Sequence, residues 1–120
     1  MHTGDIGTSS VIPNELDGAQ GFATLNTRVS DGLLPKYLSY FFNSYLYKNQ
    51  AYSVSTGDGR NNLNMKDFVK SLILVPPPEE QKKIAQILST WDESIETIEK
   101  LIEKKKKLLK SLLNDYFSEK

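Results

Sequence analysis

The last third of the chain carries one continuous periodic pattern. After the run Pro76-Pro77-Pro78, apolar side chains recur at alternating steps of four and three residues as far as Tyr116. Such spacing is typical of a coiled-coil seam. The a positions are Leu88, Ile95, Ile102, Leu109 and Tyr116, and the d positions are Ile84, Trp91, Ile98, Lys105 and Leu112. The pattern predicts a helix over residues 78–118, which at 1.5 Å per residue is about 60 Å long. The residues before it form too small a core to bury such a helix, so we expect it to meet another long helix.

Two seam positions depart from the aliphatic pattern. Lys105 is polar at a d position, where it costs stability and can fix the register or the number of strands. Trp91 is large but fits packing better than ligand binding. The basic run Lys104-Lys105-Lys106-Lys107 with Lys110 is typical of a solvated helix face, and contact with phosphates is the alternative.

Residues 1–77 predict a small mixed domain, and the whole chain an α+β fold. Strand character is found at 6–12, 21–29, 52–55 and, most strongly, at the apolar run 72–75. A helix should begin at Pro35, where a missing N–H costs nothing, and end near Asn49-Gln50. Asn64 suits the N-cap of a second, short helix. We expect the first helix to bury one face, made of Leu38, Phe41, Phe42, Tyr45 and Leu46.

Composition narrows the functional classes. The 120 residues include no cysteine, which excludes a disulfide framework and a thiolate zinc site. No run approaches the ~20 apolar residues of a membrane span, and no signal peptide precedes the domain, so we expect a cytoplasmic protein without a membrane partner. The formal net charge is zero, whereas an independent DNA-binding domain is usually basic.

Several motifs together resemble one family. The junction Pro76-Pro77-Pro78-Glu79-Glu80-Gln81-Lys82-Lys83-Ile84-Ala85 resembles the segment that closes a target recognition domain in the DNA specificity (S) subunits of type I restriction-modification systems. Gly4-Asp5-Ile6-Gly7 with Ile12-Pro13, the Tyr-Leu-rich stretch 35–42 and the Gly-rich loop 56–64 resemble further parts of that domain. The resemblance covers nearly the whole chain.

The resemblance implies a role and a set of partners. Residues 1–77 would be part of a target recognition domain that reads one half of a split site in double-stranded DNA. Residues 78–118 would pair antiparallel with an equivalent helix and set the spacing between half-sites. Methyltransferase (M) subunits and a restriction (R) subunit would supply the chemistry, with no cofactor on this chain. Since only part of one recognition domain is present, as in a fragment or a short reading frame, a homodimer through the seam is the natural substitute.

Two loops hold the candidate DNA contacts. In the Gly-rich loop, Arg60 can bond guanine or phosphate bidentately, and the amides of Asn61 and Asn62 match adenine. Lys66 follows as a candidate phosphate contact. Near the N-terminus, Thr8 and Ser9 carry hydroxyls suited to phosphate oxygens. The alternative for each loop is a purely structural turn.

The residues give little support to catalysis. His2 is the only histidine, and no Asp/Glu/His cluster has the spacing of metal ligands. We therefore expect a non-catalytic subunit. The rival hypothesis is a protein-interaction module without a DNA role, a small globular cap on a dimerising coiled coil. Salt-dependent binding to duplex DNA distinguishes the two.

Overall fold

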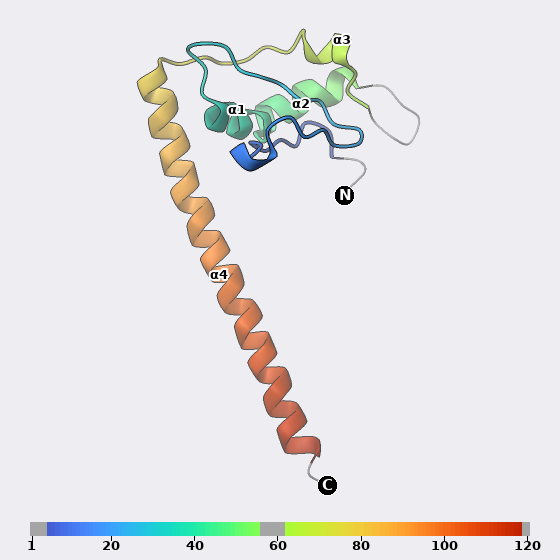
Figure 1. The fold of residues 1–120 in the computed structure, drawn as a ribbon, viewed down its shortest axis with the longest axis vertical. Helices are drawn as coiled ribbons and strands as arrows, with labels where there is room; N and C mark the ends of the chain where they lie inside the picture. Colours follow the sequence, from blue (N-terminus) through green and yellow to red (C-terminus); the bar gives the residue numbers. More distant parts are fainter. Residues whose placement is uncertain (1–4, 56–61, 119–120) are drawn as a thin grey trace. The chain divides into compact units, whose positions relative to one another are not determined.

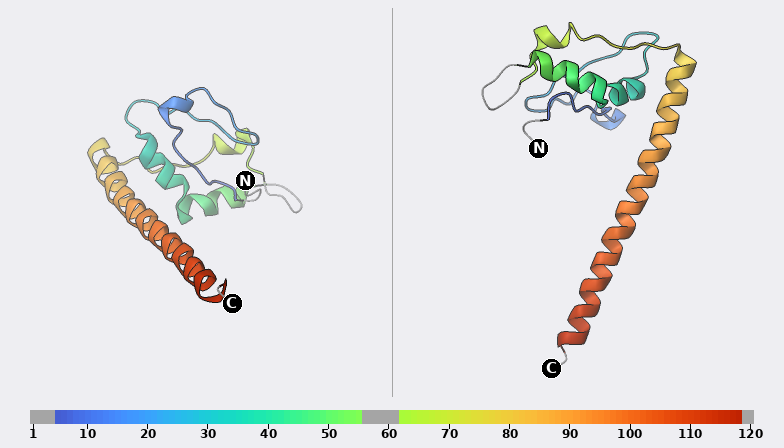
Figure 2. Two further views of the ribbon diagram at one scale, coloured as in Figure 1. Left: turned by 60° about the horizontal axis from the view of Figure 1, so that its bottom comes forward. Right: turned by 180° about the vertical axis from the view of Figure 1, so that it is seen from behind.

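The computed structural model describes residues 5–55 and 62–118. The chain divides into two compact units, Met1–Ala85 and Gln86–Lys120. A short 3-10 helix, η1 (Asn14–Leu16), is followed by the helices α1 (Pro35–Phe42), α2 (Tyr45–Val54), α3 (Met65–Phe68) and α4 (Pro78–Ser118). In the first unit the non-helical segments run around α1 and α2 (Figures 1 and 2). None of the helices in the described residues combines the length and the apolar character that a membrane span requires.

The stretch after Pro35 forms two helices, and our expectation of one continuous helix is wrong. Asn43 ends α1, and the Ser44 hydroxyl accepts a hydrogen bond from the Tyr47 N–H at 3.3 Å, which caps the start of α2. This new start changes the buried face. Tyr45 and Leu46 are 82% and 57% exposed, while Tyr47 is almost fully buried. The predicted strand at 52–55 is also wrong, since Tyr45–Val54 is helical.

The core of the first unit lies where α1 and α2 meet. It consists of Ile6, Leu38, Phe41, Phe42, Tyr47 and Ala51. The rings of Phe42 and Tyr47 lie with their centroids 4.5 Å apart, and Phe68 of α3 meets Phe42 edge-on at 5.7 Å. Gly7 packs over this core with φ +81°, and a Cβ there would lie 3.3 Å from the Tyr47 ring. Any other residue at position 7 would be strained in its backbone and tight against that ring.

The helix caps follow the sequence expectations. Pro35 occupies the start of α1, and Pro78 the start of α4. The Asn64 side chain accepts a hydrogen bond from the Asp67 N–H at 3.0 Å and so caps α3. These features are local, and the residue type at each position is sufficient to produce them.

The apolar run 72–75 is extended, but it is not the buried strand we expected. Leu72, Leu74 and Val75 are 79%, 61% and 60% exposed, and only Ile73 packs against the core. Along this run the backbone forms hydrogen bonds with side chains rather than with a neighbouring strand. Gln50 pairs with both the N–H (2.6 Å) and the C=O (3.2 Å) of Leu72. Tyr37 donates its hydroxyl to the Leu74 carbonyl at 2.8 Å, and burial, aided by the Glu80 carboxylate, raises the pKa of that phenol.

Strands are therefore scarce in the part of the chain that the structure describes. Asn62 forms an isolated β-bridge, and the segments 6–12 and 21–29 are irregular rather than strands. The α+β class is matched only weakly: the described residues are mostly helical, with one long helix at the end. Strand pairing depends on residues far apart in sequence, whereas a strand-like composition is only local. The predicted segments have the composition of strands, but none of them pairs with a neighbouring strand among the described residues.

Gln81 ties the first turn of α4 to the rest of the first unit. Its side chain is fully buried, at 0% exposure. The amide oxygen accepts from the Leu34 N–H at 2.9 Å, and the amide nitrogen donates to the carbonyls of Gly32 and Pro76, both at 2.8 Å. One side chain thus satisfies three backbone groups from two separate segments. Gln81 is the glutamine of the Pro-Glu-Glu-Gln junction, and these bonds give that motif a physical role.

Candidate nucleic-acid interface and helix seam

The structure gives the N-terminal candidates, Thr8 and Ser9, structural partners. Thr8 donates its hydroxyl to the Asp5 carboxylate at 2.6 Å. Asn43 binds both the N–H and the C=O of Ser9, at 2.9 and 2.8 Å. These bonds fasten the segment after Gly7 onto the end of α1. A phosphate at this place would have to compete with them.

Lys48 is a basic residue here that the sequence analysis did not single out. Its ammonium lies 3.2–3.3 Å from the Asp5 carboxylate oxygens and 3.2 Å from the Thr8 hydroxyl. The three residues come from the N-terminal segment and from α2, so only the fold brings them together. An ion pair this exposed contributes at most about 1 kcal/mol to stability.

The structure describes only residues 62–64 of the Gly-rich loop. Arg60 and Asn61 lie outside the described residues. Asn62 follows them and is exposed, and Lys66 is exposed on α3. Lys70 follows the end of α3 and is also exposed. Residues 62–70 therefore present the amide of Asn62 and the ammonium groups of Lys66 and Lys70 to solvent. Asn64, by contrast, is used as a cap.

The seam of α4 is exposed along the second unit. Apart from half-buried Ile84, every predicted seam residue presents surface to solvent, with Trp91 66% and Ile98 57% exposed. Lys105 interrupts this apolar stripe, because it lies at a d position of the heptad. Two ion pairs, Glu96–Lys100 at 2.7 Å and Glu103–Lys107 at 3.2 Å, lie at b and f positions, away from the seam. An exposed apolar stripe of this length is typical of an interaction surface.

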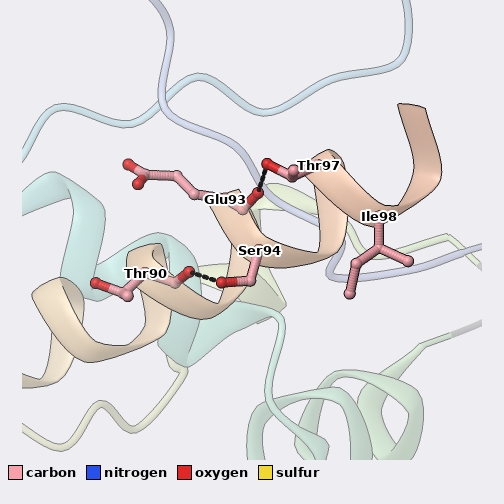
Figure 3. A pocket seen from close by; sticks show the side chains of 5 residues that line it. All are labelled: Thr90, Glu93, Ser94, Thr97 and Ile98. Carbon is pink, nitrogen blue, oxygen red and sulfur yellow. Dashed lines mark hydrogen bonds between the residues drawn. The ribbon is translucent and has the colours of Figure 1, made fainter. Parts of the chain in front are cut away.

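A shallow depression lies on one flank of this seam. It is lined by Thr90, Glu93, Ser94, Thr97 and Ile98. Figure 3 shows the hydroxyls of Ser94 and Thr97 bonded to the carbonyls of Thr90 and Glu93, one turn earlier, at 3.0 and 2.9 Å. Because these hydroxyls bond to their own helix, the depression offers small side chains, one edge of Ile98 and the Glu93 carboxylate.

No group of three or more His, Asp or Glu side chains capable of holding a metal ion occurs in the described ranges. What remains is a small globular unit with basic and amide groups at one loop, joined through a buried glutamine to a long helix with an unpartnered apolar seam.

Comparison with known proteins places the chain in a family. Residues 1–107 match the type I restriction modification DNA specificity domain, and the chain belongs to this family. It is 31% identical over 112 residues to the type I restriction enzyme MjaIX specificity subunit of Methanocaldococcus jannaschii, an alignment that covers 93% of this chain and 26% of that protein. The MjaVIII specificity subunit of the same organism is 37% identical over 78 residues, which cover 65% of this chain and 18% of that protein.

The chain thus spans about a quarter or less of the length of these curated relatives. No solved structure matches the chain significantly. The resemblance seen in the sequence motifs is confirmed by the family match.

Proposed function

We propose that this chain supplies DNA specificity to a type I restriction-modification assembly, as part of a target recognition domain joined to its spacer helix. The observation that supports this most directly is the family match over residues 1–107. The junction supports it further, because Gln81 fixes the start of α4 within the globular unit. In this proposal the globular unit reads one half-site of double-stranded DNA, and the chain itself is non-catalytic.

DNA reading would fall to the loop before α3. Arg60, Asn61 and Asn62 supply base-edge donors and acceptors, and Lys66 supplies a charge for a phosphate. Thr8 and Ser9 are secondary candidates, since their polar groups already hold the N-terminal segment in place. Lys48, beside them, adds a further positive charge.

Replacing Arg60 with alanine tests the reading role. If Arg60 contacts a base, the change should cost about 1–3 kcal/mol of binding and relax the preference at one base pair. Lys66→Ala should instead weaken binding to all sequences about equally, because a phosphate carries no sequence information. Site-specific methylation by the assembly reconstituted with methyltransferase subunits measures both. If Arg60→Ala left affinity and preference unchanged, the loop would be only a structural turn.

The partners would be type I methyltransferase (M) and restriction (R) subunits, and a second copy of this chain. The seam of α4 supports the second copy, because it is long, apolar and exposed. In the proposed homodimer two α4 helices pair antiparallel and hold two recognition units apart. The length of α4 then determines the spacing between half-sites.

Lys105 allows a direct test of the seam. Replacing it with leucine removes a charge from a d position, so we expect a higher melting temperature of the assembled chain. Thermal unfolding followed by circular dichroism at a fixed concentration measures this, and light scattering checks whether the number of strands changes. An unchanged or lower melting temperature would mean that the heptad register is wrong at this position.

The second candidate function is a protein-interaction module without DNA binding. The formal net charge of zero favours it, because nonspecific DNA affinity comes from cationic surfaces. A titration of duplex DNA at several salt concentrations distinguishes the two functions. A DNA reader loses duplex affinity steeply as salt rises, whereas a coiled-coil scaffold shows no duplex binding at any salt concentration.

A further inference from the structure

We infer that two copies of α4 pair in one particular antiparallel register, in which seam residues whose numbers sum to 200 face each other. This inference rests on the proposed homodimer and specifies which side chains select it. The seam is symmetric about residue 100. The facing pairs are Ile84 with Tyr116, Leu88 with Leu112, Trp91 with Leu109, Ile95 with Lys105 and Ile98 with Ile102.

Neighbouring antiparallel registers lose contacts. If one helix slides by one heptad so that the numbers of facing residues sum to less than 200, Leu112 faces Gln81 and Tyr116 faces Pro77. Gln81 is already buried in the first unit. A shift the other way places Leu88 opposite Glu119 of the second copy. Each lost layer exposes apolar surface, at about 25 cal/mol per Å². The sum of 200 uses every seam residue.

The charges along α4 favour the antiparallel direction. Residues 86–103 contain five acids and one base, and residues 104–118 contain five bases and one acid. An antiparallel pair places the acidic half of one copy beside the basic half of the other. At the e positions next to the seam, Asp92 then faces Lys106 of the second copy, twice per dimer. A parallel pair would bring like halves together.

The g positions lead to the same conclusion. They include Ile87, Ser94, Leu101 and Leu108, and the three apolar residues are 52–59% exposed. In an antiparallel pair g faces g, so Leu101 meets Leu101 of the second copy at the two-fold axis. In a parallel pair g faces e, so Ile87 and Leu101 would lie against Asp92 and Lys106 of the other copy. The antiparallel arrangement removes these two contacts and leaves one apolar residue facing a charge, Ile87 against Asp115 of the second copy.

The depression of Figure 3 fits this register. Ser94, a g residue, lines it together with Thr90 and Thr97. With seam sums of 200, the g residues that face each other sum to 202, which brings Leu108 of the second copy to Ser94. A leucine thus enters a depression whose hydroxyls are bonded to their own helix.

One contact of this register is unfavourable, since the e residue Glu99 faces Glu99 of the second copy near the axis. Lys105, a d residue, faces Ile95 of the second copy and weakens the seam there, which is the cost that Lys105→Leu removes.

Cross-linking of the full chain tests the register, since the chain has no native cysteine. With a short thiol-specific cross-linker, Leu101→Cys should give covalent dimer in high yield. Leu88→Cys should give background yield, because its two copies would be about 36 Å apart along the axis at 1.5 Å per residue. A mixture of Leu88→Cys and Leu112→Cys should cross-link again. Efficient linkage of Leu88→Cys alone would overturn the antiparallel register.

Charge reversal provides an independent test. Asp92→Lys should weaken dimerisation about tenfold, and adding Lys106→Asp should restore it. Glu103→Lys makes the same charge change at an exposed b position, away from the seam and from the depression, and should leave dimerisation unchanged. Sedimentation of the unmodified chain is measured first. A monomer there would contradict the homodimer itself, whereas a dimer that is insensitive to Asp92→Lys and does not link through Leu101→Cys would contradict only the register.

Discussion

Replacing Gln81 with leucine should lower the free energy of unfolding of the first unit by about 3 kcal/mol or more. The leucine matches the glutamine in size but leaves the Leu34 N–H and the Gly32 and Pro76 carbonyls without their partner. The three bonds are partly buried, and a polar group left unpaired away from water costs about 1–3 kcal/mol. Urea unfolding of the full chain, followed by the near-ultraviolet signal of the tyrosines, measures the loss.

Two further variants separate the hydrogen bonds from other effects. Gln86→Leu makes the same chemical change on the same helix, but at an exposed position, and should alter stability by less than about 0.5 kcal/mol. Gln81→Glu keeps an acceptor for the Leu34 N–H, loses both donated bonds and buries a charge, so it should be at least as damaging as the leucine. If Gln81→Leu were as stable as Gln86→Leu, the three bonds would not hold the junction.

The role of Gln81 shows where sequence reasoning fell short. Gln81 stands in a charged run, between Glu80 and Lys82, and such a run is usually exposed to solvent. The motif drew attention to the junction, but nothing in the local sequence places a loop from residues 32–34 against it. The contact is between residues almost fifty positions apart, so only the tertiary structure reveals it.

Features that depend on local chemistry were predicted well. The proline starts of α1 and α4 and the Asn64 cap are set by one or two residues. The periodicity over residues 78–118 gave the long helix because it repeats many times. Ser44 is a typical cap residue, but it lies inside an apolar periodic stretch, and the pattern on both sides concealed the break between α1 and α2.

The strand predictions were wrong because strands depend on contacts that are not local. Residues 72–75 are apolar enough for a buried strand, but a strand is defined by its neighbours. In this structure the side chains of Gln50 and Tyr37 bond the backbone of this run where a neighbouring strand would. An alternating sequence pattern cannot indicate such bonds. For the candidate DNA site, the sequence identified residue types but not their partners. The sequence therefore indicated Thr8 and Ser9 as candidate DNA contacts, whereas in the structure their polar groups form hydrogen bonds within the fold.

Replacing Ile98 with aspartate should abolish self-association of the chain. Ile98 lies at a d position in the middle of the seam and is 57% exposed on a single helix. In the dimer it would face Ile102 of the second copy, so the substitution would bury an unpaired carboxylate in two layers. An uncompensated buried charge costs about 3–5 kcal/mol, which for a single layer already weakens association more than a hundredfold. Light scattering at tens of micromolar should then give the mass of a monomer.

The control is Asn114→Asp, which adds the same negative charge at an exposed f position of α4 and should leave the dimer intact. Circular dichroism distinguishes loss of association from loss of the globular unit. The core around Phe42 and Tyr47 belongs to residues 1–85, and the substitution lies outside it. The signal from that unit should therefore persist while the helical signal of α4 falls, since an isolated helix of this kind depends on packing of its apolar face. A dimer that survived Ile98→Asp would show that the seam is not the interface, and the spacing role proposed for α4 would then require a different partner surface.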